Sequence, residues 1–383
     1  MHIPMSYLTL AGVKFVLKNE TLLPANFLAS LRVFQVDTAG DAQPITIEVV
    51  KAAPPNGEAV FCSTSMRVSS VGNVDSAGRL FVVPRDKSCA LLADGDTWTV
   101  YVDGETDATD SLRVLFRMAF EQHVSPLGVL SLHACAFVYG GKAYCTTGKS
   151  GAGKSTLAGN VRKALSDVWV LNGDRPIVRE ENGSFIAYGA PWSGKENIFI
   201  NDSRPLGAII EVKKCGVDKL YRLPPKLAAK LLLKRVSLPL WDSEAVGDVI
   251  ATVSRAAERV PVFRMYCKND VSAGETLLAA LEHPEQVILL PEGEDTMKIK
   301  KNFVMRKMLD EYIVVPVGAD SAAAQGAIML NEVGAFLWER MAEETTRELL
   351  LEQMLAEYEV EKEVASADLD AFLQSLRDAN VLE

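Results

Sequence analysis

Eight consecutive residues near the middle of the chain, Gly148-Lys-Ser-Gly-Ala-Gly-Lys-Ser155, restrict its fold more than any other segment. They fit the pattern G-x-x-x-x-G-K-[ST], in which glycines let backbone N–H groups turn inward around phosphate oxygens without interference from a Cβ atom. By composition, about one chain in a hundred of this length would contain the pattern by chance. Because such a loop lies between a strand and a helix, it predicts an α/β domain that binds nucleotide phosphates.

The segments on both sides of the loop have the required character. Ala134–Tyr139 and Lys142–Thr147 alternate or run apolar around Gly140-Gly141, which predicts a hairpin whose second strand leads into the loop. Lys154–Leu165 predicts a helix, and the positive end of its dipole adds to the attraction for anions. Transporter ATPases share this loop, but they also carry an LSGGQ-like signature and a long succession of parallel βαβ units. Neither is present here, since the segments after the helix have the pattern of hairpins.

The residue types in and after the loop indicate its ligands. Lys154 is expected to reach the β and γ phosphates of ATP, and the Ser155 hydroxyl is expected to ligate Mg²⁺. Asp174 follows an apolar strand, Val168–Asn172, and would hold the same ion directly or through water. ATP and Mg²⁺ are therefore the predicted cofactors. The predicted nucleotide-binding residues are Gly148, Ser150, Gly151, Ala152, Gly153, Lys154, Ser155 and Thr156.

Two further side chains are catalytic candidates besides Lys154 and Asp174. His133 lies fifteen residues before the loop and would either orient Asp174 or accept the proton of an acceptor hydroxyl, because histidine titrates near neutral pH. A core histidine without a chemical role is the alternative interpretation. Lys195 follows a glycine in the loop Gly189–Glu196, where a cation suits a transferring phosphoryl group. A solvated surface lysine fits that position equally well.

Charge divides the chain into parts. From Gly293 to its end it holds 19 acidic and 9 basic residues, whereas the preceding 292 residues hold 31 of each. Pro291–Asp295 has the composition of a linker, so we predict domains at 1–110, 111–290 and 291–383. No basic field exists that would bind a nucleic acid. Since no apolar run reaches 18 residues and the first residues lack a signal-peptide pattern, we expect a cytoplasmic protein with no membrane partner.

The outer parts of the chain carry secondary-structure signals but no catalytic motif. Residues 1–110 are predicted to be β-rich, with strands at Tyr7–Phe15, Ser30–Val36, Ile45–Val50, Leu80–Val83 and Thr97–Val102. Helices are predicted at Leu112–Glu121 and near 224–235 and 243–259. Residues 291–383 predict strands at Phe303–Arg306, Tyr312–Val317 and Gly326–Leu330, and helices near 331–341, 346–357 and 366–379. A capping box of Thr345 and Glu348 and an N-cap at Ser366 support the last two helices. The six cysteines form no Cys-x-x-Cys pair and are expected to be free thiols.

His133, the phosphate loop and Asn172-Gly173-Asp174 together resemble the HPr kinase/phosphorylase family. The resemblance covers about 125–265 and implies an HPr-kinase-like (PEP-carboxykinase-like) P-loop domain that phosphorylates a Ser or Thr hydroxyl. The family has an Asp at the position of Lys149 and an Asp-Asp pair at Gly173-Asp174. The missing carboxylate is the one that the family uses as its base, so the reverse reaction is not expected, and His133 and Asp174 both stay candidates for the base. Ile210-Glu211-Val212-Lys213 only partly matches the family's second signature, which argues against HPr as substrate.

The segment Leu330-Asn331-Glu332-Val333-Gly334-Ala335-Phe336-Leu337-Trp338 is similar to PqqD-type domains, small winged-helix modules that bind the leader of a peptide about to be modified. This resemblance implies a C-terminal winged-helix PqqD-like domain. The predicted partner is a ribosomally made precursor peptide, whose leader would add a strand beside Tyr312–Val317 or Gly326–Leu330.

Two other functions fit the same motifs. One is a kinase for a small molecule such as free serine, with the tail serving assembly. The other is a nucleotide-sensing, peptide-binding module or chaperone with little turnover, which the missing carboxylate would suit. The sequence does not identify the acceptor, the role of residues 1–110 or the oligomeric state. A homo-oligomer is one of the alternatives that it leaves open.

Overall fold

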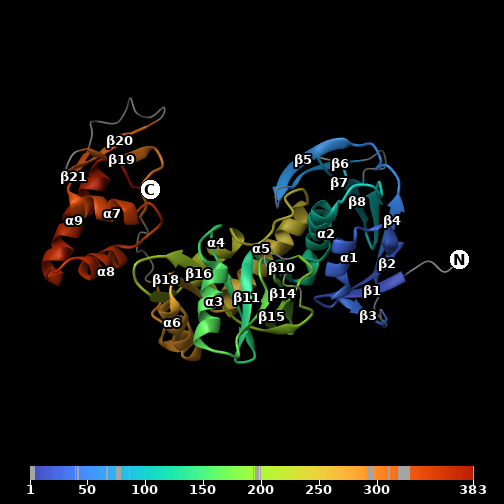
Figure 1. The fold of residues 1–383 in the computed structure, drawn as a ribbon, viewed down its shortest axis with the longest axis horizontal. Coiled ribbons are helices and arrows are strands. Elements are labelled where there is room, and N and C mark those ends of the chain that lie inside the picture. The colour runs from blue at the N-terminus through green and yellow to red at the C-terminus, as the bar shows by residue number, and fades with distance from the viewer. Residues whose placement is uncertain are drawn as a thin grey trace. The chain divides into compact units, whose positions relative to one another are not determined.

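The computed structural model in Figure 1 divides the chain into two compact units. It describes residues 5–38, 40, 43–65, 68–74, 79–85, 87–192, 194, 198, 200–290, 297–308, 311–317 and 328–382. The first unit comprises Met1–Lys213, Leu220–Met265 and Asn269–Ile288, and the second comprises Lys214–Lys219, Tyr266–Lys268 and Leu289–Glu383. The predicted α/β class is confirmed, since the chain combines helices and strands. No helix within the described ranges is long and apolar enough to cross a membrane.

The N-terminal residues form one large sheet with the strand order β3-β1-β2-β4-β9-β8-β7-β6-β5. Its strands are β1 (Met5–Leu10), β2 (Val13–Lys18), β3 (Gln35–Val36), β4 (Ile45–Lys51), β5 (Glu58–Ser65), β6 (Val68–Val74), β7 (Leu80–Pro84), β8 (Cys89–Asp94) and β9 (Thr97–Val102). A 3₁₀ turn, η1 (Glu20–Leu22), and a helix, α1 (Ala25–Arg32), follow the first hairpin. The β-rich character predicted for this region is confirmed.

Two of the strand predictions in this region need correction. Tyr7–Phe15 is a hairpin of β1 and β2, because Ala11-Gly12 takes φ values of 47° and 80° that are typical of a tight turn between strands. Ser30–Val36 lies partly in α1, and only its last two residues form a strand. A short apolar run does not distinguish a strand from a buried helix, and here the buried positions have helical spacing. The buried apolar residues of α1 are Phe27, Leu28 and Leu31.

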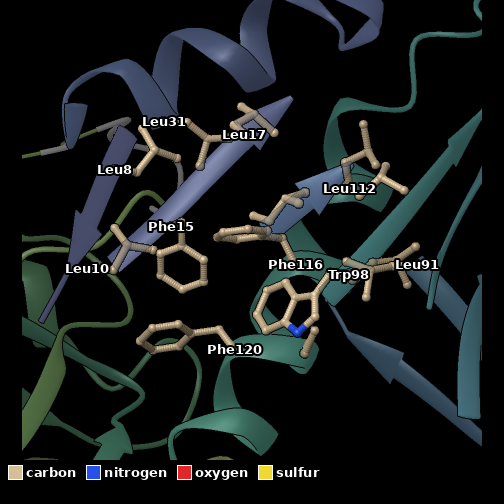
Figure 2. Packing of buried hydrophobic residues seen from close by; sticks show 14 of the residues in the cluster. Leu8, Leu10, Phe15, Leu17, Leu31, Leu91, Trp98, Leu112, Phe116 and Phe120 are labelled. Atoms are coloured by element: carbon tan, nitrogen blue, oxygen red, sulfur yellow. The ribbon is translucent and has the colours of Figure 1, made fainter. Parts of the chain in front are cut away.

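Helix α2 (Thr109–His123) packs into the core of the N-terminal sheet. Figure 2 shows Phe116 and Phe120 of this helix beside Phe15 and Trp98 of the sheet. The ring centroids of Phe15 and Trp98 lie 5.6 Å apart, and those of Phe15 and Phe116 lie 5.8 Å apart. The predicted domain boundary between residues 110 and 111 therefore falls inside a helix that belongs to the N-terminal core.

The same core extends into the part of the chain that carries the phosphate loop. Trp192 is 2% exposed and belongs to this cluster, with its ring centroid 5.3 Å from that of Phe120. Its indole ring therefore packs against aromatic side chains of the core. The N-terminal region and the phosphate-loop region thus share one hydrophobic core within the first unit.

The phosphate loop belongs to a second, mixed sheet with the order β10-β14-β15-β16-β12-β11-β13, to which β18 and β17 are added through β16. Its strands are β10 (Val129–Ser131), β11 (Ala134–Tyr139), β12 (Lys142–Thr147), β13 (Trp169–Asn172), β14 (Ile177–Glu181), β15 (Ser184–Tyr188), β16 (Ser203–Lys214), β17 (Lys219–Arg222) and β18 (Val262–Cys267). The hairpin of β11 and β12 and that of β14 and β15 were both predicted, and both are confirmed. Strand β12 pairs with β16 in parallel, so the loop leaves the sheet beside the C-terminal end of β16.

The helices of this region agree with the sequence patterns. They are α3 (Lys154–Ala164), α4 (Pro225–Leu233), α5 (Ser243–Arg259) and α6 (Val271–Glu282), with short 3₁₀ turns η2 (Ser125–Leu127) and η3 (Pro284–Gln286). The predicted helices near 154–165, 224–235 and 243–259 are confirmed, whereas α6 was not predicted. Asp242 caps α5 by accepting hydrogen bonds from the backbone N–H groups of Glu244 and Ala245.

The second unit contains the strands β19 (Phe303–Met308), β20 (Glu311–Pro316) and β21 (Ile328–Leu330) and the helices α7 (Glu332–Arg340), α8 (Arg347–Glu357) and α9 (Lys362–Asp378). The strand and helix order is the predicted one, and Trp338 lies in the core of this unit. Both predicted caps are wrong. Thr346, not Thr345, caps α8, and Ser366 lies inside α9, where its hydroxyl accepts a hydrogen bond from Arg347.

The six cysteines of the chain are free, as predicted.

Candidate active site

The phosphate loop connects the end of β12 to the start of α3, as the sequence predicts. Gly153 caps the helix with φ at 97°, a conformation that residues with a Cβ atom rarely adopt. Gly148 is closely surrounded, since a Cβ atom there would lie 3.0 Å from the Cβ of Ala152 and 3.1 Å from the carbonyl oxygen of Val212. Ser150, Ser155 and Thr156 are exposed. The glycines are therefore required by the backbone path of the loop itself.

The Lys154 side chain folds back over the loop. Its Nζ donates to the carbonyl oxygens of Gly148 at 3.3 Å and Lys149 at 3.4 Å. Burial lowers the pKa of Lys154, and the negative charge of Asp174 opposes this effect. These two hydrogen bonds to neutral carbonyls are long, so an anion in the loop would be a stronger partner for the ammonium group.

His133 and Asp174 meet at the edge of the loop. The Nε2 atom of His133 lies 3.6 Å from Oδ1 of Asp174, and the two side chains are 32% and 28% exposed. Backbone pairing fixes this contact, because the N–H of Ala134 donates to the carbonyl oxygen of Asp174 at 2.9 Å. The Thr147 hydroxyl donates to the carbonyl oxygen of His133 at 2.7 Å, which places the histidine beside the first residue of the loop. The fifteen-residue spacing read from the sequence is thus one hairpin that brings His133 back to the loop.

Asn172 organises the turn that carries Asp174, although it was not among the predicted site residues. Its buried Oδ1 accepts hydrogen bonds from the backbone N–H groups of Asp174 at 3.0 Å and Arg175 at 2.7 Å. Its Nδ2 donates to the carbonyl oxygens of Ala190 at 3.4 Å and Trp192 at 3.2 Å. Asn172 therefore ties the end of β13 to the loop that Trp192 anchors in the N-terminal core.

The predicted Mg²⁺ ligands suit that ion. The ionisable groups nearest to Asp174 are His133 at 3.6 Å and Arg175 at 4.0 Å, distances that leave its carboxylate oxygens available for a cation. Ser155 supplies a second hard oxygen donor of the kind that Mg²⁺ prefers. Among the described residues, no group of three or more His, Cys, Asp or Glu side chains could hold a metal ion. Mg²⁺ at Ser155 and Asp174 would take its remaining ligands from phosphate oxygens and water.

The structure thus brings three of the four predicted catalytic residues together, namely His133, Lys154 and Asp174. The fourth, Lys195, lies outside the described residues. Two cations near the site were not predicted. Arg175 follows Asp174 directly and donates to the Ser237 hydroxyl at 2.9 Å, and Arg235 follows α4. Arg175 directly follows the predicted site residue Asp174 in the sequence and could have been selected for that reason. Arg235 has no such signal, because an isolated bridge between Leu132 and Val236, which lie far apart in the sequence, places it beside His133.

The electrostatic environment of His133 gives a testable titration. Burial is the main cause that lowers the pKa of this imidazole, from 6.5 to about 4, followed by the charges of Lys154 and Arg175; Asp174 opposes them. In nucleotide-free and metal-free protein, the His133 ring should therefore titrate near pH 4 in an NMR experiment, with His133→Gln assigning the signal. Lys154→Ala should raise the midpoint of the His133 titration, because it removes a positive charge that opposes protonation of the ring. A midpoint near the ordinary value would contradict the described burial of His133.

The same pKa shift makes the stability of the protein depend on pH. Between about pH 4 and pH 6.5, His133 binds more protons in the unfolded state than in the folded state. Its contribution to the free energy of unfolding is therefore present above about pH 6.5 and is lost towards pH 4.

Comparison with known proteins identifies the C-terminal part of the chain. Residues 285–382 match the family model described as coenzyme PQQ synthesis protein D (PqqD). This part of the chain is a PqqD domain. The match confirms the resemblance read from Leu330–Trp338 and begins slightly before the predicted boundary at 291. The resemblance of residues 125–265 to HPr kinases stays a prediction.

Among solved structures, a chain titled "TbiB1 in Complex with the TbiA(beta) Leader Peptide" is 26% identical to the matched part of the sequence. The comparison covers 22% of the present chain and 94% of the other, with a TM-score of 0.20. No curated protein matches the chain.

Proposed function

We propose that the protein is a Mg²⁺-dependent and ATP-dependent kinase that phosphorylates a Ser or Thr hydroxyl of a ribosomally made precursor peptide. The observation that supports a phosphotransferase most directly is the position of His133 and Asp174 beside a phosphate loop that contains Lys154. Phosphoryl transfer depends chiefly on positioning and on neutralising charge, and these residue types supply both.

In the proposed reaction, the acceptor oxygen attacks the γ-phosphorus of ATP, the bond to the β–γ bridging oxygen breaks, and ADP leaves. Lys154 would neutralise the β and γ phosphates, while Ser155 and Asp174 would hold the Mg²⁺ ion, which offsets the remaining negative charge. The proton of the hydroxyl would pass to Asp174 or to His133. Its lowered pKa keeps the imidazole of His133 neutral at pH 7 and therefore able to accept a proton.

The PqqD domain supports a peptide as the acceptor, because PqqD-type domains are modules that bind the leader of a peptide about to be modified. Its sheet has the order β19-β20-β21, so both edges of β20 are already paired. A leader peptide therefore cannot add a strand beside β20, and the first of the two predicted leader positions, beside Tyr312–Val317, is wrong. Within the described residues, β21 pairs only with β20, which leaves its other edge for the leader.

The division of labour between the two parts can be tested by deleting residues 293–383. If the PqqD domain only raises the local concentration of the peptide, the deletion should raise KM for full-length precursor by about a hundredfold and change kcat little. ATP binding should be unchanged. A precursor without its leader should behave alike with intact and truncated protein.

Steady-state kinetics on these four combinations of enzyme and peptide decide between the alternatives. Excess leader peptide, added separately to the intact chain, should compete with full-length precursor and leave the leaderless substrate unaffected. Equal loss of turnover with both peptides would mean that the C-terminal part is needed for catalysis, and recruitment would be refuted. Turnover of free serine but of neither peptide would indicate the small-molecule kinase instead.

A further inference from the structure

We infer that three lysines on one side of α4 form a docking surface for an acidic segment of the peptide that carries the acceptor hydroxyl. The surface consists of Lys226, Lys230 and Lys234, and we call it the α4 lysine face. The inference rests on the proposed function and deepens it, because it names the chemical character of the substrate. Glutamate or aspartate residues should lie close in sequence to the Ser or Thr that is phosphorylated.

The geometry of α4 places the three lysines on its solvent side. They are spaced four residues apart, and residues at this spacing lie on the same side of a helix. All three are exposed, whereas Ala228 and Leu232 are buried. Lys234 follows the last residue of α4 and keeps a helical backbone, with φ at −79° and ψ at −8°. At 1.5 Å per residue, the α4 lysine face is about 12 Å long.

The positive charge of this face is not compensated by the protein itself. The segment Pro225–Leu233 contains no acidic residue, and none of the three lysines forms an ion pair or a side-chain hydrogen bond within the described ranges. The neighbouring helix α5 differs, since Arg255 and Arg259 lie 2.6 and 2.7 Å from the carboxylate of Glu180.

The arrangement of the lysines does not help to form the helix either. Like charges four residues apart repel each other, and Lys226 lies in the first turn, where the helix dipole disfavours a cation. Because these three charges oppose the local structure and have no partner in it, we assign them to the binding of an anionic partner.

The α4 lysine face ends beside the candidate active site. The residue after Lys234 is Arg235, whose carbonyl oxygen accepts a hydrogen bond from the N–H of His133 at 2.8 Å. The imidazole of His133 lies 3.6 Å from the carboxylate of Asp174, and these two groups are the candidates for the base. A peptide whose hydroxyl reaches either of them would have its neighbouring residues near the C-terminal end of α4. Since an extended peptide advances about 3.3 Å per residue, about four residues cover the face.

The size of the face favours an acidic peptide over larger polyanions. The whole chain has a net charge of −10, and its first 292 residues hold equal numbers of acidic and basic residues. A nucleic acid or an anionic membrane would extend well beyond the three lysines and would be repelled by the acidic residues around them. A short peptide segment can place its carboxylates against the lysines alone.

The test uses two labelled synthetic peptides and full-length protein with Mg²⁺ and a non-hydrolysable ATP analogue. Both peptides contain one central serine, flanked on both sides by glutamates in the first peptide and by glutamines in the second. Fluorescence anisotropy should show that the triple variant Lys226→Gln, Lys230→Gln, Lys234→Gln weakens the glutamate peptide at least about tenfold and leaves the glutamine peptide unchanged. Raising the salt concentration from about 50 to about 200 mM should weaken the glutamate peptide more in wild-type protein than in the variant.

The matched control neutralises three other exposed lysines by Lys51→Gln, Lys142→Gln and Lys163→Gln, which lie on β4, β12 and α3. An equal loss of the glutamate peptide in this control would trace the effect to net charge, and the inference would fail. It would also fail if wild-type protein did not prefer the glutamate peptide. An α4 variant that loses binding to phosphatidylserine vesicles or to RNA, with no change for either peptide, would overturn it as well. Should the triple variant unfold, Lys230→Glu alone provides the same comparison.

The outcomes for the docking surface and for the proposed function can be separated. Protein that prefers the glutamate peptide but binds no Mg²⁺-ATP would refute the proposed kinase and leave the α4 lysine face as a peptide-binding surface. Protein that binds Mg²⁺-ATP without preferring the glutamate peptide would refute the docking surface and leave the kinase in place.

Discussion

Replacing Asp174 by asparagine is expected to lower phosphoryl transfer by at least about a hundredfold, because the reaction loses a ligand of Mg²⁺ or its general base. The fold should be retained. The backbone hydrogen bonds at this position, from its N–H to Asn172 and from Ala134 to its carbonyl oxygen, do not involve the carboxylate. The side chain is 28% exposed, and asparagine has nearly the same shape.

Initial rates of ADP formation with saturating ATP and peptide measure this effect. The control is Asp110→Asn, which makes the same chemical change at an exposed carboxylate 3.4 Å from Arg113 on α2. An exposed pair of this kind contributes little, so the control should alter the rate by no more than about twofold. If Asp174→Asn retained full turnover, the carboxylate of the reaction would have to lie elsewhere in the chain.

Replacing Lys154 by alanine should weaken the binding of Mg²⁺-ATP by about 2–3 kcal/mol, or about thirty- to a hundred-and-fiftyfold. The variant removes the ammonium group from a loop whose backbone is already shaped by Gly148 and Gly153. Within the described residues, the hydrogen bonds that Lys154 Nζ donates to two loop carbonyls, at 3.3 and 3.4 Å, are long. The stability of the protein should therefore change much less than the affinity for ATP.

Calorimetric titration with Mg²⁺-ATP provides the measurement. Lys163→Ala is the control, since Lys163 is an exposed lysine in the last turn of the same helix and nine residues from Lys154. Nine residues correspond to about 13.5 Å along a helix, too far for contact with the phosphates. Unchanged affinity in Lys154→Ala would remove the basis for nucleotide binding in this loop.

Local patterns were sufficient where a turn or a helix cap sets the structure. Gly140-Gly141 and Asn182-Gly183 both take positive φ values and close the two predicted hairpins. The loop pattern placed the start of α3 at Lys154, and the apolar stretch before Asp174 became β13. Local patterns failed where an apolar run was short. Ser30–Val36 has residues that suit a strand, but burial against α2 and the sheet favours the helix α1 for its first part.

The sequence by itself determined the phosphate loop, the hairpin that returns His133 to it, and the PqqD domain. Each depends on residues close together in the chain, where turn geometry and spacing leave few alternatives. Only the tertiary structure decided the remaining parts of the site. Trp192 joined the N-terminal core, Asn172 became the hydrogen-bonding centre of the Asp174 turn, and Arg235 reached Glu211. These contacts join strands that lie far apart in the sequence, and a single sequence carries no signal for such pairings because they depend on which surfaces bury one another.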